Sequence, residues 1–221
     1  MGKFDAKKKP LFSSGKKHRF DREKNQQQQE EPLTFSQLML ECAHDLAYIL
    51  VVLLILFTFV ARFVIVSGDS MFNTLADGDY LLLLNSPLCG ELEQGDIVVA
   101  SMSRFRNGEA IVKRVIATEG QVVDIDFRAG IVYVDGVALE EPYTYTPTNV
   151  AEGMTFPLVV DEGCVFLMGD NRNESMDSRD PEIALVDTRE ILGKAIFLVF
   201  PGSGTGKHPV EWDFGRIGGL D

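Results

Sequence analysis

Histidine and cysteine are both scarce in this chain of 221 residues, and each shortage disfavours a class of active site. His18 lies in a polar N-terminal arm, His44 precedes a long apolar run, and His208 lies in a glycine-rich C-terminal stretch. None follows a strand-like segment beside an acidic partner, so a Ser-His-Asp triad and a histidine-based metal site are both disfavoured. The three cysteines form no Cys-x-x-Cys pair, and the sequence therefore predicts no bound metal.

An excess of positive charge, which marks most nucleic-acid-binding proteins, is also missing. The formal net charge is -12, and residues 46–221 carry 12 Lys/Arg against 26 Asp/Glu. Such an acidic surface repels phosphate groups, so the sequence predicts no nucleic-acid partner.

The sequence leaves the pairing of the cysteines open. Cys42 precedes the apolar run, whereas Cys89 and Cys164 follow it. The latter two could form a disulfide if their compartment is oxidising. Two unpaired thiols fit the sequence at least as well.

The N-terminal segment 1–45 is basic and polar, with 9 Lys/Arg and a run of four glutamines at 26–29. We expect residues 1–31 to be disordered, because they cannot bury enough apolar surface to offset the entropy of ordering. A short helix is expected over 32–45. Lys/Arg-rich flanks of membrane segments stay in the cytoplasm, which predicts a cytoplasmic N-terminus.

Leu46–Val66 is an apolar segment of 21 residues with one charge, Arg62, near its end. About 20 apolar residues are enough to cross a bilayer as a helix. A cleaved signal peptide is the competing interpretation, but its basic region is usually much shorter than 45 residues. We therefore expect one uncleaved transmembrane anchor. The β-branched residues at 63–66 also fit the start of a first strand.

Beyond the anchor, short apolar runs alternate with Gly, Asn, Asp and Pro, and no amphipathic helix is evident. This pattern predicts a mostly β, antiparallel sheet or barrel-like extracytoplasmic domain over 67–201, and a loose C-terminal tail over 202–221. The expected strands are Tyr80–Leu84, Ile97–Ser101, Ala110–Thr118, Gln121–Asp126, Ile131–Val134, Val165–Met168 and Lys194–Phe200.

Ser70 lies just after the apolar segment, flanked by Gly68 and Asp69. The position suits a nucleophile presented to a membrane-bound substrate, but Gly-Asp-Ser turns are also common connectors. With histidine disfavoured, Lys113 is the best candidate for its base. It lies in an otherwise apolar strand, where burial lowers the pKa of an amine and makes it a general base. The alternative is a surface charge on an edge strand.

A third polar group of residues, 169–180, directly follows the predicted strand Val165–Met168. Its density of Asp, Asn, Arg and Ser is typical of an ordered loop held by side-chain hydrogen bonds. Asp177 and Arg179 are close enough in sequence to pair, and Ser175 or Ser178 could hold an amine. A solvated hairpin loop is the competing interpretation.

Taken together, these pieces resemble the type I signal peptidases (leader peptidases), a family that uses a Ser-Lys dyad. The matching segments occur in the family's order behind the anchor: Gly68–Leu75, Gly95–Val99, Lys113–Gly120 and Gly169–Arg179. The resemblance implies that Ser70 is the nucleophile, Lys113 its base, and Ser175 a hydrogen-bond partner that orients the lysine.

The resemblance also implies two supporting ion pairs, Asp177 with Arg179 and Asp170 with Arg114. Gly68 stands where some members carry a serine that stabilises the oxyanion, as in versions seen among Gram-positive bacteria. The second oxyanion donor would then be backbone or water.

The function implied by the resemblance is a membrane-anchored serine endopeptidase that removes signal peptides from exported preproteins, without a cofactor. Its expected partners are preprotein signal peptides and the lipid bilayer, in the plasma membrane, with a monomer favoured. Lipid contact is expected beside Ser70, with core packing as the alternative for each candidate: Phe63, Met71, Phe72 and Leu75. Two competing functions are a tethered β domain with an impaired site and a Ser-Lys peptidase with specialised substrates.

Overall fold

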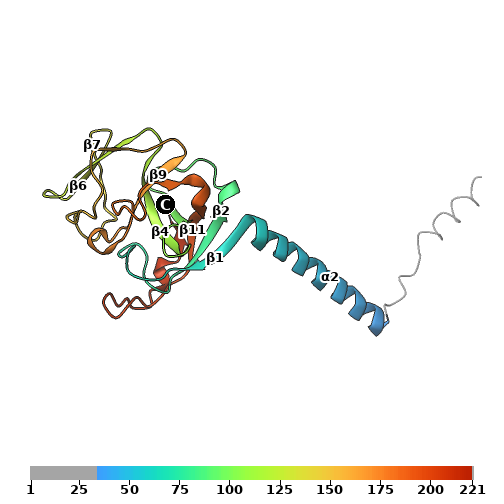
Figure 1. Cartoon of the computed structure of the whole chain (residues 1–221). Coiled ribbons are helices and arrows are strands. Elements are labelled where there is room, and N and C mark those ends of the chain that lie inside the picture. The colour runs from blue at the N-terminus through green and yellow to red at the C-terminus, as the bar shows by residue number, and fades with distance from the viewer. Residues whose placement is uncertain (1–33, 221) are drawn as a thin grey trace, which may run out of the picture. The chain divides into compact units, whose positions relative to one another are not determined.

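The computed structural model of the chain describes residues 34–220 (Figure 1). The expectations for the arm at 1–31 therefore lie outside the described residues. The chain divides into two units after Leu50, and the second unit, from Val51 onward, contains all the β structure.

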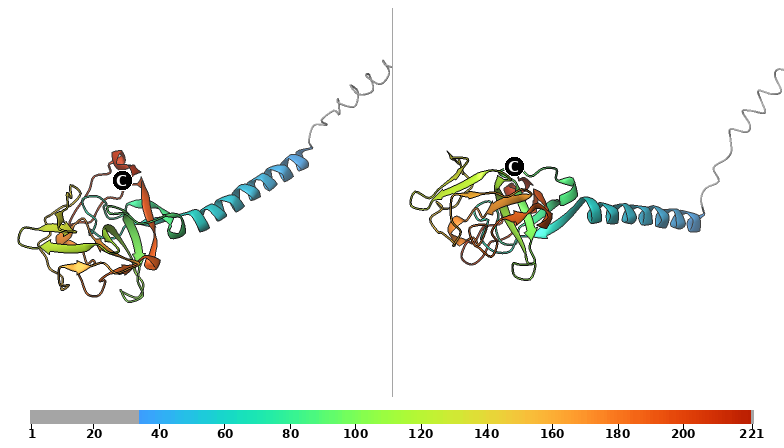
Figure 2. Two further views of the ribbon diagram at one scale, coloured as in Figure 1. Left: turned by 90° about the horizontal axis from the view of Figure 1, so that it is seen from above. Right: turned by 45° about the horizontal axis from the view of Figure 1, so that its top comes forward.

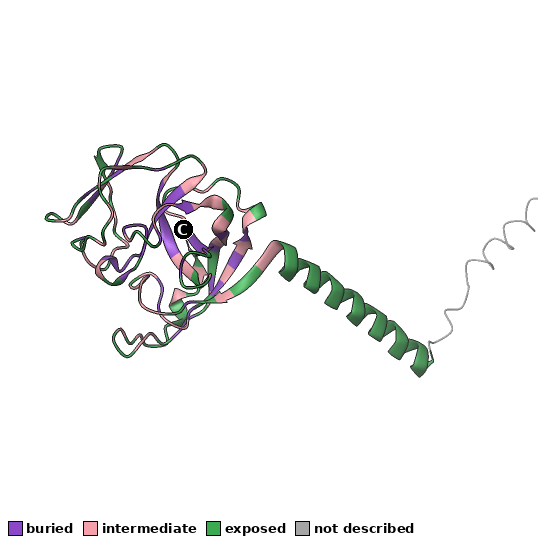
Figure 3. Ribbon diagram, viewed as in Figure 1, coloured by how far each residue is buried: buried purple, intermediate pink, exposed green. Residues whose placement is uncertain are grey.

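The apolar segment forms helix α2 (Phe35–Ile55), followed by a π-helical turn η1 (Leu56–Val60). Their side chains are largely exposed, as Figure 3 shows for α2. Phe35–Val60 is the one helical segment among residues 34–220 that is long and apolar enough to cross a membrane, with a mean hydropathy of 2.3. The helix thus starts earlier than the predicted anchor and ends earlier as well. Its last predicted residues form strand β1 (Ala61–Ile65) instead.

The larger sheet has eight antiparallel strands in the order β1-β2-β11-β3-β4-β9-β10, with β12 paired to β11. Their bounds are as follows: β1 Ala61–Ile65, β2 Tyr80–Asn85, β3 Ile97–Ser101, β4 Ala110–Thr118, β9 Cys164–Met168, β10 Val186–Asp187, β11 Ile191–Phe200 and β12 Gly218–Gly219. Short 3₁₀ turns occur at Ser86–Leu88, Arg172–Glu174, Thr188–Glu190 and Phe214–Arg216.

A smaller antiparallel sheet has the order β7-β6-β5-β8, and its strands β6 and β7 lie at one edge of the domain (Figure 2). Its strands are β5 Val122–Asp126, β6 Ile131–Val134, β7 Val137–Ala138 and β8 Leu158–Val159. All seven strands predicted from the sequence are present, most with ends shifted by no more than one residue, and the expected antiparallel β fold is confirmed.

Alternation along β3 separates the core of the larger sheet into two clusters. Val98 and Ala100 pack in one of them, and Ile97 and Val99 in the other, because successive strand residues point to opposite faces. A third cluster, which includes Val123 of β5, joins the smaller sheet to β4 and β9. The centre of the larger sheet is therefore closed to water on both faces, and β4 crosses it (Figure 3).

The polar residues singled out in the sequence lie in two segments that follow strands of the larger sheet. The first, residues 66–79, joins β1 to β2 and is called the Ser70 loop. The second, residues 169–179, follows β9 and is called the polar loop. Because β9 pairs with β4, the polar loop begins next to the strand that carries Lys113 and Arg114.

Candidate active site

The turn that carries Ser70 is fixed to the core by the residues that follow it. Met71 and Leu75 are 1% and 0% exposed and pack with β2 and β3. The Leu75 N–H also donates to the Met71 carbonyl at 2.8 Å. These two residues, proposed above as lipid-facing, are thus part of the core. Ser70 itself stays half-buried, and its N–H donates to no group within residues 34–220.

Gly68 starts this turn in a left-handed conformation, with φ of +88°. Its N–H donates to Asp77 Oδ1 at 2.7 Å, which closes the base of the loop. A serine in this backbone conformation would be strained, since residues with a Cβ rarely adopt it. The absence of a serine hydroxyl at Gly68 therefore follows from the local backbone.

Lys113 lies on β4, opposite Val98, and is 3% exposed. Its Nζ is 2.7 Å from Ser70 Oγ and 3.1 Å from the Val112 carbonyl oxygen. The first distance is within the ~2.6–3.2 Å that proton transfer between a nucleophile and its base requires. The edge-strand alternative for Lys113 is wrong, because β4 lies between β3 and β9.

The environment lowers the pKa of Lys113 from 10.5 to about 8. Burial is the main cause, since it removes the water that stabilises an ammonium ion. The carboxylates of Asp177, Glu152 and Asp170 raise the pKa in part, and Arg179 lowers it. A much larger fraction of the amine is therefore neutral near neutral pH than for an exposed lysine, and the neutral form has a lone pair to accept a proton.

The polar loop reaches the Ser70 loop through its backbone. The Asn171 N–H donates to the Ser70 carbonyl at 3.0 Å, and Asn171 Nδ2 donates to the Asp69 carbonyl at 3.1 Å. A Cβ on Gly169 would collide with the Ser70 carbonyl oxygen and with the Ser175 side chain. Glycine is required there because the two loops approach each other so closely.

Arg114 and Asp170 form a buried ion pair between β4 and the start of the polar loop. Arg114 Nε and Nη2 donate to the Asp170 carboxylate at 2.9 and 2.7 Å. Arg114 is 5% exposed, Asp170 is 0% exposed, and Thr74 of the Ser70 loop donates its hydroxyl to Asp170. The pair implied by the resemblance therefore also contacts the Ser70 loop.

Asp177 and Arg179 form a second buried pair, with Nε–Oδ1 and Nη2–Oδ2 distances of 2.8 Å. Glu152, which the sequence did not single out, lies 3.2 Å from the same guanidinium. Burial, followed by the charge of Asp177, raises the pKa of Glu152 to about 7. Glu152 comes from an irregular segment without a motif, so only the fold reveals it.

Ser175 is 3% exposed, but it makes no hydrogen bond with the Lys113 amine. Its Oγ has no hydrogen-bond partner within the described residues. The orienting contact implied by the resemblance is thus not formed in this structure, although Ser175 packs against Gly169 between the two loops.

Ser70 and Lys113 open onto a cleft of about 300 Å³. One side is formed by the end of β1 and the residues after it, and the other by β4 from Ala110 to Lys113. Glu174 and Met176 of the polar loop also line the cleft, as do Val99 of β3 and residues 105, 106 and 109 before β4. An extended segment between two strands has backbone partners available, so the cleft suits a peptide chain.

The C-terminal residues contact the Ser70 loop, which the sequence did not predict. The His208 ring stacks on Phe72, with centroids 4.6 Å apart, and its Nε2 lies 3.4 Å from Glu174 Oε2. Arg216 pairs with the buried carboxylate of Asp79 at 2.6 Å. Residues 202–220 are therefore not the expected loose end. His208 is also not remote from Ser70, because its ring stacks on Phe72, two residues after Ser70.

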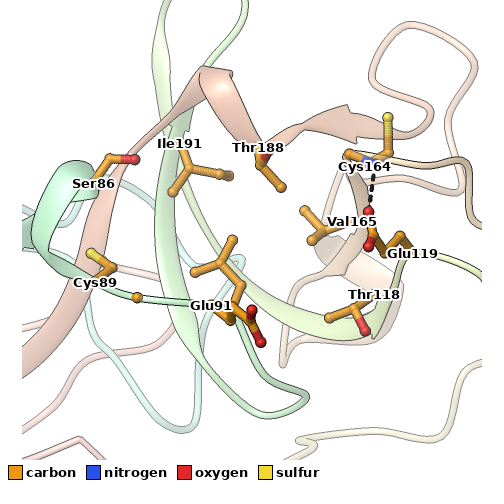
Figure 4. A pocket seen from close by; sticks show the side chains of 12 residues that line it. Ser86, Cys89, Glu91, Thr118, Glu119, Cys164, Val165, Thr188 and Ile191 are labelled. Carbon is orange, nitrogen blue, oxygen red and sulfur yellow. Dashed lines mark hydrogen bonds between the residues drawn. The ribbon is translucent and has the colours of Figure 1, made fainter.

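Cys89 and Cys164 are free thiols in the structure. They lie on opposite sides of a separate pocket of about 400 Å³ between β11, β9 and the turn after β2 (Figure 4). Burial raises the pKa of both thiols, which disfavours the reactive thiolate. Within residues 34–220, no group of three or more His, Cys, Asp or Glu side chains is arranged to hold a metal ion.

Comparison with known proteins gives one consistent result. The model of the family described as "Signal peptidase, peptidase S26" matches residues 39–200. A probable signal peptidase I-1 of Synechocystis sp. is 38% identical over 166 residues, which cover 72% of this chain and 81% of the relative. Signal peptidase I T of Bacillus subtilis is 36% identical, over 62% of this chain and 72% of the relative.

A crystal structure of a signal peptidase I from Enterococcus faecalis is also similar, with 29% sequence identity and a TM-score of 0.39. The match covers 47% of this chain and 96% of that structure.

Proposed function

The chain belongs to the signal peptidase family S26 and is a peptidase of that family, and from this premise we propose that it cleaves with Ser70 and Lys113 as a catalytic dyad. The observation that carries the proposal is the 2.7 Å distance between Lys113 Nζ and Ser70 Oγ. The lowered pKa of the buried amine supports the same roles, because a base must be neutral to accept a proton.

In the proposed reaction, the Ser70 hydroxyl donates its proton to the neutral Lys113 amine as Oγ attacks the scissile carbonyl carbon. The ammonium then protonates the leaving amine of the mature protein, and an ester between Ser70 and the signal peptide remains. Lys113, neutral again, takes a proton from a water that hydrolyses the ester. As the ester bond breaks, Lys113 passes this second proton to Ser70 Oγ and the signal peptide leaves as a carboxylate, so both side chains return to their starting state.

The tetrahedral intermediate needs donors for its negative oxygen, and the Ser70 N–H is free for this role in the described residues. A single oxyanion donor is typically worth about 10²–10³ in kcat. Gly68 supplies no side-chain donor, so the proposed second donor is a water molecule or a backbone N–H group.

We propose that the substrates are preproteins and that the chain acts at a membrane. Support for the membrane comes from the length and composition of Phe35–Val60. Further support comes from exposed apolar side chains. Phe63 of β1 is 52% exposed, and Trp212 and Phe214, which contact Phe200 at the end of β11, are 59% and 57% exposed. Trp is enriched at membrane–water interfaces, where its ring lies at the level of the lipid headgroups.

The test is cleavage of a purified preprotein by the purified full chain in detergent. The wild type is expected to release the mature protein, with an N-terminal sequence that starts at the signal junction. Ser70→Ala and Lys113→Ala are each expected to abolish the product. Cleavage that persists in Lys113→Ala would refute the dyad, and an inactive but folded wild type would favour the impaired, partner-binding alternative.

A further inference from the structure

Two sets of contacts outside the core hold the main chain of the Ser70 loop, and they come from different parts of the chain. The polar loop holds its main chain at the Asp69 and Ser70 carbonyls through Asn171. The other set comes from residues 202–216, which we call the C-terminal strap. The signal peptidase family model ends at residue 200, before the strap begins.

The strap contacts the Ser70 loop at several points along its length. The Gly204 N–H donates to the Asp77 carbonyl at 3.1 Å, and the Gly202 N–H donates to Asp79 Oδ1 at 2.7 Å. Arg216 donates to the Asp79 carboxylate and, at 3.3 Å, to the Thr74 carbonyl. The contacts of the strap therefore lie on both sides of Leu75, which packs into the core.

The contact nearest to the nucleophile is made by Thr205. Its hydroxyl donates to Asp69 Oδ2 at 2.7 Å, and Asp69 directly precedes Ser70. The other carboxylate oxygen, Asp69 Oδ1, is buried and has no partner within the described residues. The Thr205 hydroxyl is thus the one side-chain or backbone donor to this carboxylate in residues 34–220.

Two neighbours of Thr205 connect the strap to the cleft. Lys207 and His208 both lie beside the carboxylate of Glu174, which lines the cleft that Ser70 opens onto. The His208 ring also covers Phe72. The strap therefore contacts the Ser70 loop and the cleft wall at the same time.

We propose that Thr205 is a positioning residue, which orients Ser70 by holding the Asp69 carboxylate. The proposal rests on the proposed role of Ser70 as nucleophile. A charged group that is partly removed from water needs its hydrogen bond, and without the Thr205 hydroxyl the carboxylate would turn toward solvent. The peptide that joins Asp69 to Ser70 would turn with it and move Oγ away from the Lys113 amine. Small displacements of a reacting atom reduce the rate strongly, whereas substrate binding in the cleft is retained.

The matched variants are Thr205→Val, which has the same shape but no hydroxyl, and Thr205→Ser, which restores the hydroxyl. Thr155→Val is the control, because Thr155 is an exposed threonine whose side chain makes no hydrogen bond in residues 34–220. In preprotein cleavage, Thr205→Val is expected to lower kcat about tenfold with KM unchanged, whereas Thr205→Ser and Thr155→Val retain the wild-type kcat.

Amide hydrogen exchange of the Ser70 loop provides a readout that does not need activity. The N–H groups of Phe72, Leu75 and Gly78 are hydrogen-bonded within the loop. Their exchange is expected to be faster in Thr205→Val and unchanged in Thr155→Val.

An unchanged kcat in Thr205→Val, with the wild type active and Ser70→Ala inactive, would overturn the positioning role and leave the proposed function standing. Unchanged exchange in the Ser70 loop would overturn it as well, even if the wild type proved inactive. Equal losses in Thr205→Val and Thr205→Ser would assign the effect to packing and also overturn it.

Discussion

At the scale of single residues, burial of the Lys113 amine lowers the stability of the folded chain. The same burial favours the neutral amine, which is the form that a base needs. The lowering of its pKa from 10.5 to about 8 means that the folded chain disfavours the ammonium form. The free energy of unfolding is lowered by the full amount below pH 8, where Lys113 is protonated in both the folded and the unfolded chain. This destabilisation is relieved as the pH rises from 8 to 10.5, where the unfolded chain binds more protons than the folded one.

Lys113→Met is accordingly expected to stabilise the full chain while it abolishes cleavage. At pH 7 the gain in the free energy of unfolding should be about 3 kcal/mol, since each pKa unit corresponds to 1.36 kcal/mol. The gain should shrink toward pH 10.5. Urea unfolding in detergent at several pH values measures it, and a variant less stable than the wild type at pH 7 would contradict the account.

Glu152 should influence the pH dependence of cleavage through its charge. Its carboxylate raises the pKa of Lys113 and has a pKa of about 7 itself, so it is mainly ionised where Lys113 titrates. Glu152→Gln removes that charge, and we expect the rising limb of the kcat/KM profile to move to lower pH, by less than about one unit.

The control for this change is Glu162→Gln, an exposed glutamate on the turn before β9. Its profile should coincide with that of the wild type. A shift of the Glu152→Gln limb to higher pH would contradict the assignment of Lys113 as the titrating group.

The sequence singled out Ser70 and Lys113, which the fold brings together, but not all their neighbours. A lysine inside a strand of β-branched residues stands out because an ammonium is costly in a core. Glu152 and Thr205 lie in irregular segments, and nothing local marks them. For Ser175 the sequence predicted a hydrogen bond to the Lys113 amine that the structure does not contain. Such a bond depends on the rotation of the serine side chain, which no sequence pattern determines.

At the scale of elements, the polar loop depends on ion pairs that have no access to water. Removal of one partner leaves the other charge buried, which typically costs about 3–5 kcal/mol. Asp170→Ala leaves Arg114 in this state and also removes the acceptor of the Thr74 hydroxyl.

We therefore expect Asp170→Ala to lower the stability of the chain by about 3–5 kcal/mol and to inactivate it. Arg189→Ala is the matched control, because the pair of Arg189 with Asp187 is exposed and surface pairs contribute little. The midpoints of thermal unfolding measure this, and Asp170→Ala is expected to unfold at a clearly lower temperature than Arg189→Ala. Equal midpoints for the two variants would show that the buried pair does not support the loop.

Strand prediction succeeded where the runs were long enough to show a pattern. β4, with nine residues of mostly β-branched character, was predicted with the correct ends. The strands β7, β8, β10 and β12 have two residues each, too few for an alternation to be visible, and they depend on the partner strand for their existence.

At the scale of the whole molecule, the sequence indicated the order of the parts but not the contacts between distant ones. The C-terminal residues looked loose because glycines at 202, 204 and 206 interrupt any pattern. In the fold, a Cβ at Gly202 or Gly204 would collide with the backbone of Asp77 or His208. The glycines there allow close packing, and only the three-dimensional structure distinguishes the two roles.

We propose that Lys113 activates Ser70 to form an ester with the signal peptide. The most direct measurement is mass spectrometry of the full chain after acid quenching during cleavage of a preprotein, with the modified peptide mapped. We expect an acyl group on Ser70 in the wild type and none in Lys113→Met at the same time point. An adduct on another residue, or equally fast acylation of Ser70 in Lys113→Met, would contradict it.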